Sequence, residues 1–354
     1  MSKSFLLLAL PMALYAQVWN EGGVATHFQA IGNPFGACGV PEAVLVNEKA
    51  SDYVALNVFN TPTIFPTRPL TGADKKWLGL YDNGRNCGRW LEVELGGNCS
   101  VANGGEPGQP ICGGNEANWK PDSLNGAKLY AIVTDQCSDD NGWCRDNANH
   151  IDIHTPALNN FRLPSGNLIP PYAFEQNGSW STQNYNNRQV RWRFIPAPNI
   201  KTDLNIHYSE GSKPEWRRII VTNLPNGIHG VEQWVGVDGA GTDQWQAATM
   251  GGDMGQMFVL PRADLPDPMK IRVFDANDSL VYGGRTYSFS FPASCSVGCT
   301  VASVPVDYVA TGGVFPPAAI TLPLPSSKRN LDPTAARGGL FARMYNLLGQ
   351  SRAR

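Results

Sequence analysis

The stretch Tyr130-Ala131-Ile132-Val133-Thr134-Asp135-Gln136-Cys137 decides the fold of this chain, together with the two segments that follow it. In the first stretch an apolar run ends in an acid. Gly142-Trp143-Cys144 comes next, and then His150-Ile151-Asp152-Ile153, in which a second acid stands inside an apolar alternation. This order is typical of two β-strands separated by a cysteine-bounded polar loop. We expect the strand ends to place Asp135 and Asp152 at the rim of one groove; the alternative is two surface aspartates beside a disulfide loop.

The rest of the chain also favours strands over helices. Short apolar alternations such as Trp90–Leu95 and Val190–Ile195 are separated by clusters of Gly, Asn and Pro, which predicts an all-β architecture. With 354 residues the chain is long enough for two modest domains. The segment 196–199 is typical of a short, stiff linker, and a second β segment follows from Ile200 to about Pro292.

The first 16 residues have the order of a secretory signal peptide. Lys3 precedes the apolar run Phe5–Leu10, and Ala16 offers a small residue for cleavage before Gln17. The apolar run is too short to span a bilayer. We therefore expect residues 1–16 to be removed and the mature protein to be secreted, with no membrane as partner.

The eight cysteines agree with export. An even count in a Gly- and Pro-rich exported chain favours disulfides over zinc, and the CxxC spacing of common zinc sites is absent. His150 and His154 flank Asp152 without forming a ligand pair, so we expect no metal and no cofactor. Short spans and turn residues predict three pairs: Cys99–Cys112, Cys137–Cys144 and Cys295–Cys299.

The charge of the chain is close to balanced. A formal net charge of −2 disfavours nucleic acid or an anionic membrane surface as partner. The basic excess lies in residues 293–354, which follow the second β segment and hold six Lys or Arg and two Asp. We expect this region to be a disulfide turn followed by a flexible tail, and the protein to be a monomer.

Several of these motifs occur in an order that resembles the expansins and the related family 45 glycoside hydrolases. Their T-D-x-C, G-W-C and H-x-D elements are the three segments quoted first. Gly23–Phe28 (GVATHF) is similar to the first expansin strand, and Gly36–Gly39 (GACG) and Asn86–Val93 (NCGRWLEV) are similar to later elements. Val190–Pro198 resembles the junction to the second domain of bacterial expansins.

The resemblance implies a fold and one more disulfide. Residues 17–197 would form a six-stranded double-psi β-barrel, and residues 198–292 an immunoglobulin-like β-sandwich that binds carbohydrate. A helix would lie at Pro41–Asn57, and another is plausible near Pro156–Phe161. The fourth disulfide would join Cys38 to Cys87.

The resemblance also implies the roles of the acids. Asp152 corresponds to the acid of the hydrolases, whose base lies on the first strand, and Asp135 would orient the glycan or tune the proton. The matching strand offers Thr26-His27-Phe28, with no carboxylate, and Glu21 lies outside the matched element. Thr26 is either a hydrogen-bonding partner at the opposite wall or a simple strand threonine. Inverting hydrolysis would then lack a group that activates water.

Aromatic side chains that stack on sugar rings are the expected binding signature of the second domain. Trp216 matches the second tryptophan of the bacterial W-W pair, Glu215 replaces the first, and the third aromatic falls at Met254–Gln256. Trp234 and Trp245 either substitute for these rings or fill the sandwich core. In the first domain, Trp143 either stacks on a sugar or packs on the barrel.

These observations predict a secreted expansin-like protein that binds cell-wall polysaccharide, cellulose or a related glycan, and loosens it without hydrolysis. One alternative is an enzyme, a glycan hydrolase or a lytic transglycosylase of the double-psi barrel type, since a transglycosylase can work with a single acid. The other alternative is a lectin-like structural protein of the wall.

Overall fold

The computed structural model describes most of the chain between residues 18 and 315. The predicted signal peptide, Trp143 and most of the basic tail lie outside the described residues. The described ranges are 18–60, 66–101, 110–137, 144–145, 147–170, 175–176, 179–180, 188–198 and 200–315.

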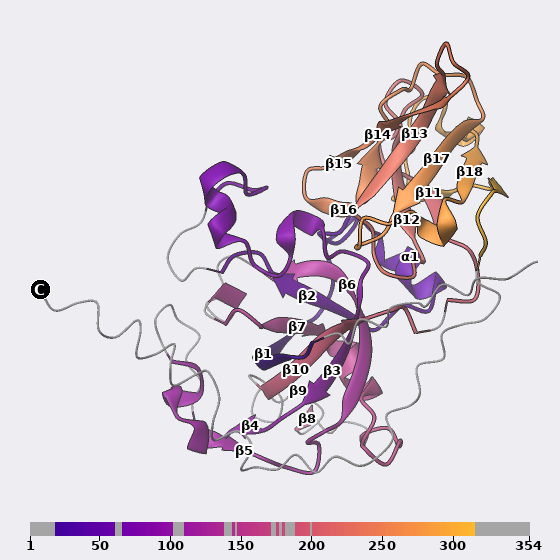
Figure 1. Ribbon diagram of the computed structural model, residues 1–354. Helices are drawn as coiled ribbons and strands as arrows, with labels where there is room; N and C mark the ends of the chain where they lie inside the picture. Colours follow the sequence, from indigo (N-terminus) through magenta and orange to yellow (C-terminus); the bar gives the residue numbers. More distant parts are fainter. Residues whose placement is uncertain are drawn as a thin grey trace, which may run out of the picture.

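The first domain is a closed barrel of six strands in the order β1-β10-β3-β6-β2-β7 (Figure 1). Alternation along the strands builds its interior: Ile151 and Ile153 of β7 are fully buried in the barrel core, and Asp152 between them points to the opposite face. The strands are β1 (Asn20–Phe28), β2 (Tyr53–Asn57), β3 (Trp90–Leu95), β6 (Lys128–Cys137), β7 (Ile151–His154) and β10 (Arg188–Ile195).

The second domain is a sandwich of two five-stranded sheets. One has the order β15-β16-β12-β11-β19 and the other β14-β13-β17-β18-β20, with an apolar core between them. The predicted all-β class, with a six-stranded barrel followed by a sandwich, is confirmed. The strands are β11 (Asn205–Ser209), β12 (Arg218–Thr222), β13 (Gly230–Val237), β14 (Asp243–Ala247), β15 (Thr249–Gly251), β16 (Met254–Val259), β17 (Met269–Phe274), β18 (Thr286–Phe289), β19 (Ser303–Pro305) and β20 (Val309–Thr311).

The sandwich continues past residue 292, where the sequence analysis ended the second domain. Strand β19 pairs with β11 and strand β20 pairs with β18, so the segment after the last disulfide adds one strand to each sheet. The run Val301–Val306 carries the β-branched residues that suit such an edge position.

Among the described residues, the helices are few and short. The α-helix α1 spans Glu42–Asn47; Lys49 then takes a left-handed conformation, and Tyr53–Asn57 are buried as strand β2. The helix predicted over Pro41–Asn57 is therefore wrong in its second half, whereas the one expected near Pro156–Phe161 is present as the 3-10 helix η5 (Thr155–Asn160). No helix among the described residues is both long and apolar enough to cross a lipid bilayer.

The remaining elements are brief. They are the ladders β4 (Asn98–Cys99) with β5 (Trp119–Lys120) and β8 (Glu175–Gln176) with β9 (Ser179–Trp180), and the 3-10 helices η1 (Gly72–Trp77), η2 (Asp82–Gly84), η3 (Ile111–Gly114), η4 (Glu116–Asn118), η6 (Val281–Gly283) and η7 (Ala293–Cys295).

All eight cysteines are paired, as predicted. The disulfides are Cys38–Cys87, Cys99–Cys112, Cys137–Cys144 and Cys295–Cys299.

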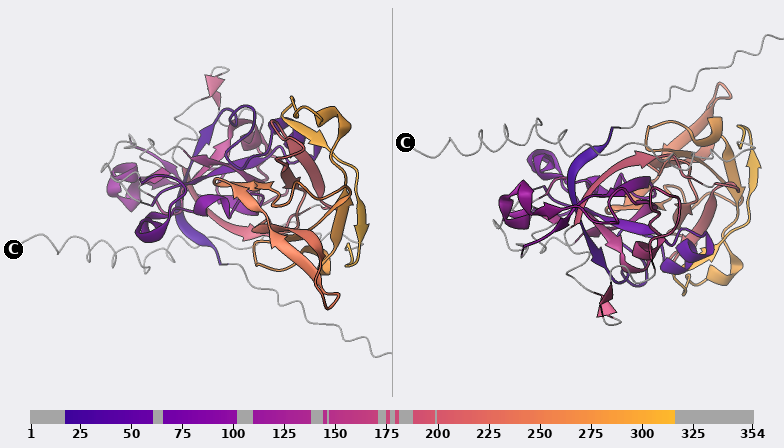
Figure 2. Two further views of the ribbon diagram at one scale, coloured as in Figure 1. Left: turned by 90° about the horizontal axis from the view of Figure 1, so that it is seen from above. Right: turned by 90° about the horizontal axis from the view of Figure 1, so that it is seen from below.

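The two domains pack tightly on each other. Val44 and Leu45 of α1 share an apolar cluster with Ile220 of β12 and Met257 of β16, so the β15-β16-β12-β11-β19 sheet turns its outer face to the barrel. At the end of α1, Glu48 accepts hydrogen bonds from Thr222 and Asn205 of that sheet. Figure 2 shows from above and from below that the second domain lies against one side of the barrel.

Candidate functional site

The site is centred on Asp152 and Thr26, which neighbouring strands bring together. β1 and β7 run parallel, with Thr26 directly opposite Asp152. Thr26 Oγ1 donates a hydrogen bond of 2.8 Å to Asp152 Oδ1. The structure thus places Thr26 as a partner of the acid, and Asp152 retains 8% of its surface exposed.

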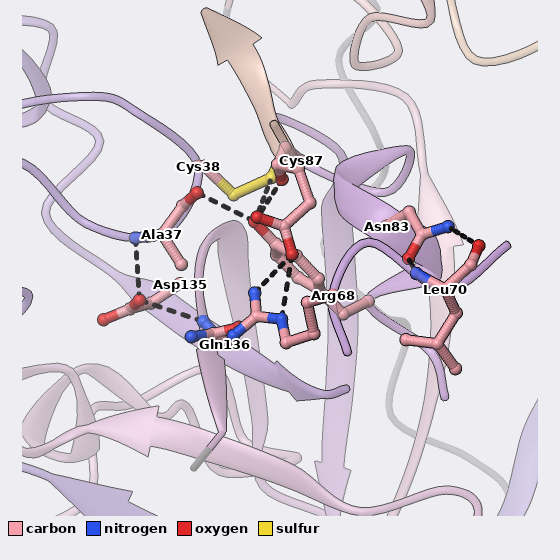
Figure 3. A network of polar contacts seen from close by, with 10 residues as sticks. Ala37, Cys38, Arg68, Leu70, Asn83, Cys87, Asp135 and Gln136 are labelled. Carbon is pink, nitrogen blue, oxygen red and sulfur yellow. Dashed lines mark hydrogen bonds and ion pairs between the residues drawn. A yellow bond between two sulfur atoms is a disulfide. The ribbon is translucent and has the colours of Figure 1, made fainter. Parts of the chain in front are cut away.

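Asp135 lies two strands away from Asp152 on the same barrel face. Ala55 of β2 is opposite Asp152 on one side and opposite Asp135 on the other, so two strand spacings, about 10 Å, separate the two backbones. Asp135 Oδ1 accepts hydrogen bonds from the amides of Ala37 and Gln136, each at 2.9 Å. Figure 3 shows this carboxylate directed at the two amides, which fixes its orientation.

Burial changes the protonation of both acids. It raises the pKa of Asp152 to about 7, the Asp135 charge adds to this, and the hydrogen bond from Thr26 opposes it. Burial also raises the pKa of Asp135, against the two backbone amides that favour its charged form. A carboxyl group whose pKa lies near neutrality can hold a proton at mildly acidic pH and donate it, which is the property of a general acid.

His150 extends this pair into a chain of three side chains. Its Nε2 lies 2.9 Å from Thr26 Oγ1, and burial lowers the pKa of the imidazole to about 3, so the ring is neutral and carries one N–H. When Asp152 is ionised, Thr26 gives its only proton to the carboxylate, and His150 Nε2–H donates to Thr26. When Asp152 is protonated on Oδ1, that hydroxyl can donate to Thr26 Oγ1, which still accepts the hydrogen bond from His150 Nε2–H. His150 Nδ1 is buried without a hydrogen-bond partner, so the chain ends at this ring.

The Cys137–Cys144 disulfide lies next to Asp152. Cys137 Sγ lies 3.7 Å from Asp152 Oδ2, and both half-cystines pack with Ala55 and Phe28. Sulfur atoms of these two residues and a His150 nitrogen lie within 4.8 Å of one another, as metal ligands would. Because the two sulfurs are bonded to each other, they are not the thiolates that zinc requires.

Glu21, the carboxylate nearest to the first-strand motif in the sequence, and His27, the titratable residue of that motif, both lie away from Asp152. His27 is opposite Ile153, a core residue, so it faces away from Asp152 and contacts Thr155 Oγ1 at 3.0 Å. Glu21 lies five residues before Thr26, about 16 Å along the strand, where Arg191 pairs with it. An inverting pair of carboxyl groups lies about 6.5–9.5 Å apart, so Glu21 is too far away.

The three described tryptophans of interest lie in the second domain, in two places. Trp216 precedes β12 and is 42% exposed, with the Arg218 guanidinium carbon 4.9 Å from its ring centroid. Trp234 and Trp245 are opposite each other on β13 and β14, at the outer surface of the other sheet. They are absent from the sandwich core, which removes the core-filling alternative for both.

The structure also shows the residues at the positions where bacterial expansins carry a third aromatic, Met254 and Gln256. Met254 is partly buried against the cluster between the domains, and Gln256 is buried and donates to Val221 O at 3.1 Å. Neither position supplies an aromatic ring beside Trp216.

Sequence reasoning missed two parts of the site. The role of His150 was not recognised, although its position two residues before Asp152 on a strand puts both side chains on one face. The amides of Ala37 and Gln136 could not be found from side-chain types at all.

Comparisons with known proteins add a structural likeness. A scan against models of protein families and a search of curated protein sequences both gave no match. Two crystal structures of an expansin from Clavibacter michiganensis are similar to the chain. One is a mutant in complex with cellohexaose (18% identity, 75% of this chain and 89% of that chain, TM-score 0.43), and the other is the apo form (19%, 75% and 89%, 0.42).

Proposed function

We propose that this protein is a secreted, expansin-like protein that binds cell-wall polysaccharide and loosens contacts between its chains without hydrolysis. The observation that carries the proposal is the pairing of Asp152 with Thr26. The buried carboxyl group of Asp152 is protonated below about pH 7 and accepts a hydrogen bond from Thr26. Thr26 is a neutral residue on the strand where the related hydrolases carry their base. The motif order and four disulfides, which suit an oxidising extracellular compartment, support the assignment.

In this mechanism Asp152 exchanges hydrogen bonds with a glycan oxygen and cleaves nothing. A neutral carboxyl group can donate to a hydroxyl or bridging oxygen that would otherwise bond a neighbouring glycan chain. The Thr26 hydroxyl can change from donor to acceptor toward Asp152 as the proton leaves or returns. Glu21 and His27 are not positioned to take a proton from water, so neither activates it. Asp135, held by two amides, orients the chain.

The wild-type protein is expected to weaken filter paper without releasing sugar. The measurements are a tensile or creep assay at pH 5–6 and a reducing-end assay on cellulose, xyloglucan, chitin and peptidoglycan over the same time. Binding without weakening would instead favour the lectin-like alternative.

The enzymatic alternative has an observation in its favour. The raised pKa of Asp152 also suits the general acid of a hydrolase or lytic transglycosylase, and Asp135 lies on the same face. Sustained sugar release that disappears in Asp152→Asn would establish that function and overturn the proposal of loosening alone.

Trp216 is expected to supply most of the affinity for neutral glucan. Trp216→Ala should lower binding of the full-length protein to cellulose roughly tenfold, because the exposed ring offers an apolar face to the sugar. Binding should depend little on salt, since residues 198–292 hold 8 basic and 11 acidic side chains. Depletion on insoluble cellulose measures it, with Trp245→Ala as the matched control. Loss in the control and not in Trp216→Ala would move the glucan site to the β14-β13-β17-β18-β20 sheet, which carries Trp245.

A further inference from the structure

A buried tyrosine at the contact between the domains touches the backbone of both. Tyr81 precedes the 3-10 helix η2 and is fully buried. Its hydroxyl oxygen lies 2.8 Å from Ala37 O in the barrel domain and 2.7 Å from Asp253 O, in the turn between β15 and β16 of the second domain. A phenolic hydroxyl carries a single proton. The two carbonyl groups therefore share one donor, and Tyr81 joins the two domains through it.

The turn at Ala37 extends this link to the acid site. The Ala37 amide donates to Asp135 Oδ1 at 2.9 Å. The peptide unit that follows is fixed at both ends, because its carbonyl oxygen accepts from Tyr81 and its amide, that of Cys38, donates to Thr134 O at 3.2 Å. Two successive peptide units thus connect the tyrosine hydroxyl to the carboxylate.

The second domain contacts the same turn from one short segment. The Gln256 amide of β16 donates to Cys38 O at 3.0 Å. Asp253, whose carbonyl oxygen contacts Tyr81, also accepts a hydrogen bond of 2.9 Å from Arg68 Nε through its carboxylate. A shift of the second domain relative to the barrel would therefore displace the partners of this turn together.

The carboxylate of Asp135 depends on the turn for its orientation. Its Oδ1 accepts one amide hydrogen bond from the adjacent Gln136 and one from Ala37, across 98 residues (Figure 3). The Gln136 amide moves with Asp135 itself, so the bond from Ala37 is the one that fixes the carboxylate relative to the rest of the barrel. Among the described residues Oδ2 has no hydrogen-bond donor, which leaves it for a glycan hydroxyl. Burial raises the pKa of Asp135, and the bond from Ala37 opposes that rise.

The charged and titratable side chains around this link belong to both domains. They are Arg68, Asp253 and Asp135 around Tyr81, with Asp152 and Tyr53 also facing Asp135. Asp152 keeps its proton up to about pH 7, and burial raises the pKa of both tyrosines, so they stay neutral. Below that pH these three side chains keep their charge while Asp135 titrates.

We propose that Tyr81 is a positioning residue that couples the docking of the second domain to the orientation of Asp135. Its hydroxyl holds the turn at Ala37, and the Ala37 amide holds the carboxylate. The inference rests on the proposed function for the role of Asp135, and adds how that site is regulated. Asp135 takes the position in which it orients a glycan when the domain that carries Trp216 is docked.

The test follows the ionisation of Asp135 in the full-length protein through the 13C resonance of its carboxyl group. Tyr81→Phe removes the hydroxyl and keeps the ring. The turn at Ala37 should loosen, and the pKa of Asp135 should rise by about one unit, because a hydrogen bond to its charged form is weakened. Tyr308→Phe is the matched control and should change nothing, since this tyrosine also donates to a backbone carbonyl, Leu204 O at 2.6 Å, but within the second domain.

Two further measurements do not require Tyr81→Phe to fold. In the wild-type protein the Cζ resonance of Tyr81 should move with the midpoint of the Asp135 titration, because the two side chains hold the same turn. Gly255→Ala tests the contact from the other domain. Its added Cβ would lie 1.8 Å from Gly84 O, so the second domain should move away and the pKa of Asp135 should rise as well.

Three results would overturn the inference: the same Asp135 titration in Tyr81→Phe and Tyr308→Phe, a Tyr81 resonance that does not respond to that titration, or separated domains in Gly255→Ala with the pKa of Asp135 unchanged. None of these measurements depends on loosening. Loosening retained in Asp135→Asn would instead remove Asp135 from the proposed function and leave the link through Tyr81 intact, so the two proposals fail separately.

Discussion

Asp152→Asn is expected to lower the rate of wall loosening at least about a hundredfold, while the protein stays folded and bound to cellulose through Trp216. Asparagine keeps the size of the side chain and an oxygen that can accept the hydrogen bond from Thr26, which is 2.8 Å long in the wild-type protein. It removes the carboxylic proton and the charge. Rates of creep or of filter-paper weakening measure the effect, and Asp74→Asn, an exposed aspartate of the barrel domain, is the matched control.

The pH dependence of the wild-type protein should follow the same group. Burial raises the pKa of Asp152 from 3.8 to about 7, so the proton-donating form is present below about pH 7 and is lost above it. Loosening should fall through that range. Thr26→Val removes the hydrogen bond that opposes this rise, so it should move the fall to higher pH. Retained loosening in Asp152→Asn, or a wild-type profile that is flat from pH 5 to 9, would remove Asp152 from the mechanism.

The pH dependence of folding stability gives a second, independent test of Asp152→Asn. A group whose folded pKa is raised binds its proton more tightly in the folded state, so its contribution to stability is full below pH 3.8 and is lost as pH rises through about 7. The loss amounts to about 4 kcal/mol at 1.36 kcal/mol per unit of pKa. Asp152→Asn should therefore match the wild type in Tm near pH 4 and exceed it at pH 8. Substitution of a surface aspartate would give no such pH-dependent difference in Tm.

The sequence predicted the parts of this structure that depend on side-chain pattern. Strict alternation of core and outward residues in His150–His154 placed Asp152 on the outer face of a barrel strand. Short cysteine spans predicted three disulfides, and the family resemblance added Cys38–Cys87. The sequence did not predict features that depend on backbone conformation, such as the residue at which a helix ends. Nothing in the apolar content of Pro41–Asn57 separates a helix from a helix followed by a strand, and the left-handed turn at Lys49 makes the division.

The site was predicted less completely than the fold. The order of residues and the family resemblance predicted Asp135, Asp152 and Thr26 as candidate site residues, but the contacts that hold them come from elements far apart in the chain. Register between β1 and β7 brings His150 and Thr26 together across 124 residues, and the turn at Ala37 supplies an amide to Asp135 across 98. Such contacts follow from strand pairing, which local patterns do not specify.

The contact between the domains requires a glycine at position 255, because a residue with a side chain would not fit there. A Cβ atom on Gly255 would lie 1.8 Å from Gly84 O and 2.7 Å from Cys87 Cβ, both in the barrel domain. Cys87 is tied to Cys38, and a Cβ on Gly84 would in turn meet Asp253 O at 2.1 Å. The two backbones thus touch directly, beside the ion pair between Arg68 and Asp253 at 2.5 Å.

Gly255→Ala is therefore expected to separate the domains while each stays folded. The clash involves backbone and a disulfide that cannot yield as a flexible side chain would, so docking should weaken by about 3 kcal/mol or more. A larger radius of gyration in solution scattering and faster proteolysis of residues 196–200 measure the separation. Loosening should fall while Trp216-dependent binding to cellulose remains, because rigid docking holds the acid site and the exposed ring in one arrangement. Gly239→Ala, where a Cβ meets nothing within 4 Å, is the matched control. A Gly255→Ala protein as compact and as active as that control would mean that the interface relaxes around the methyl group, and that loosening does not require the two domains to be fixed.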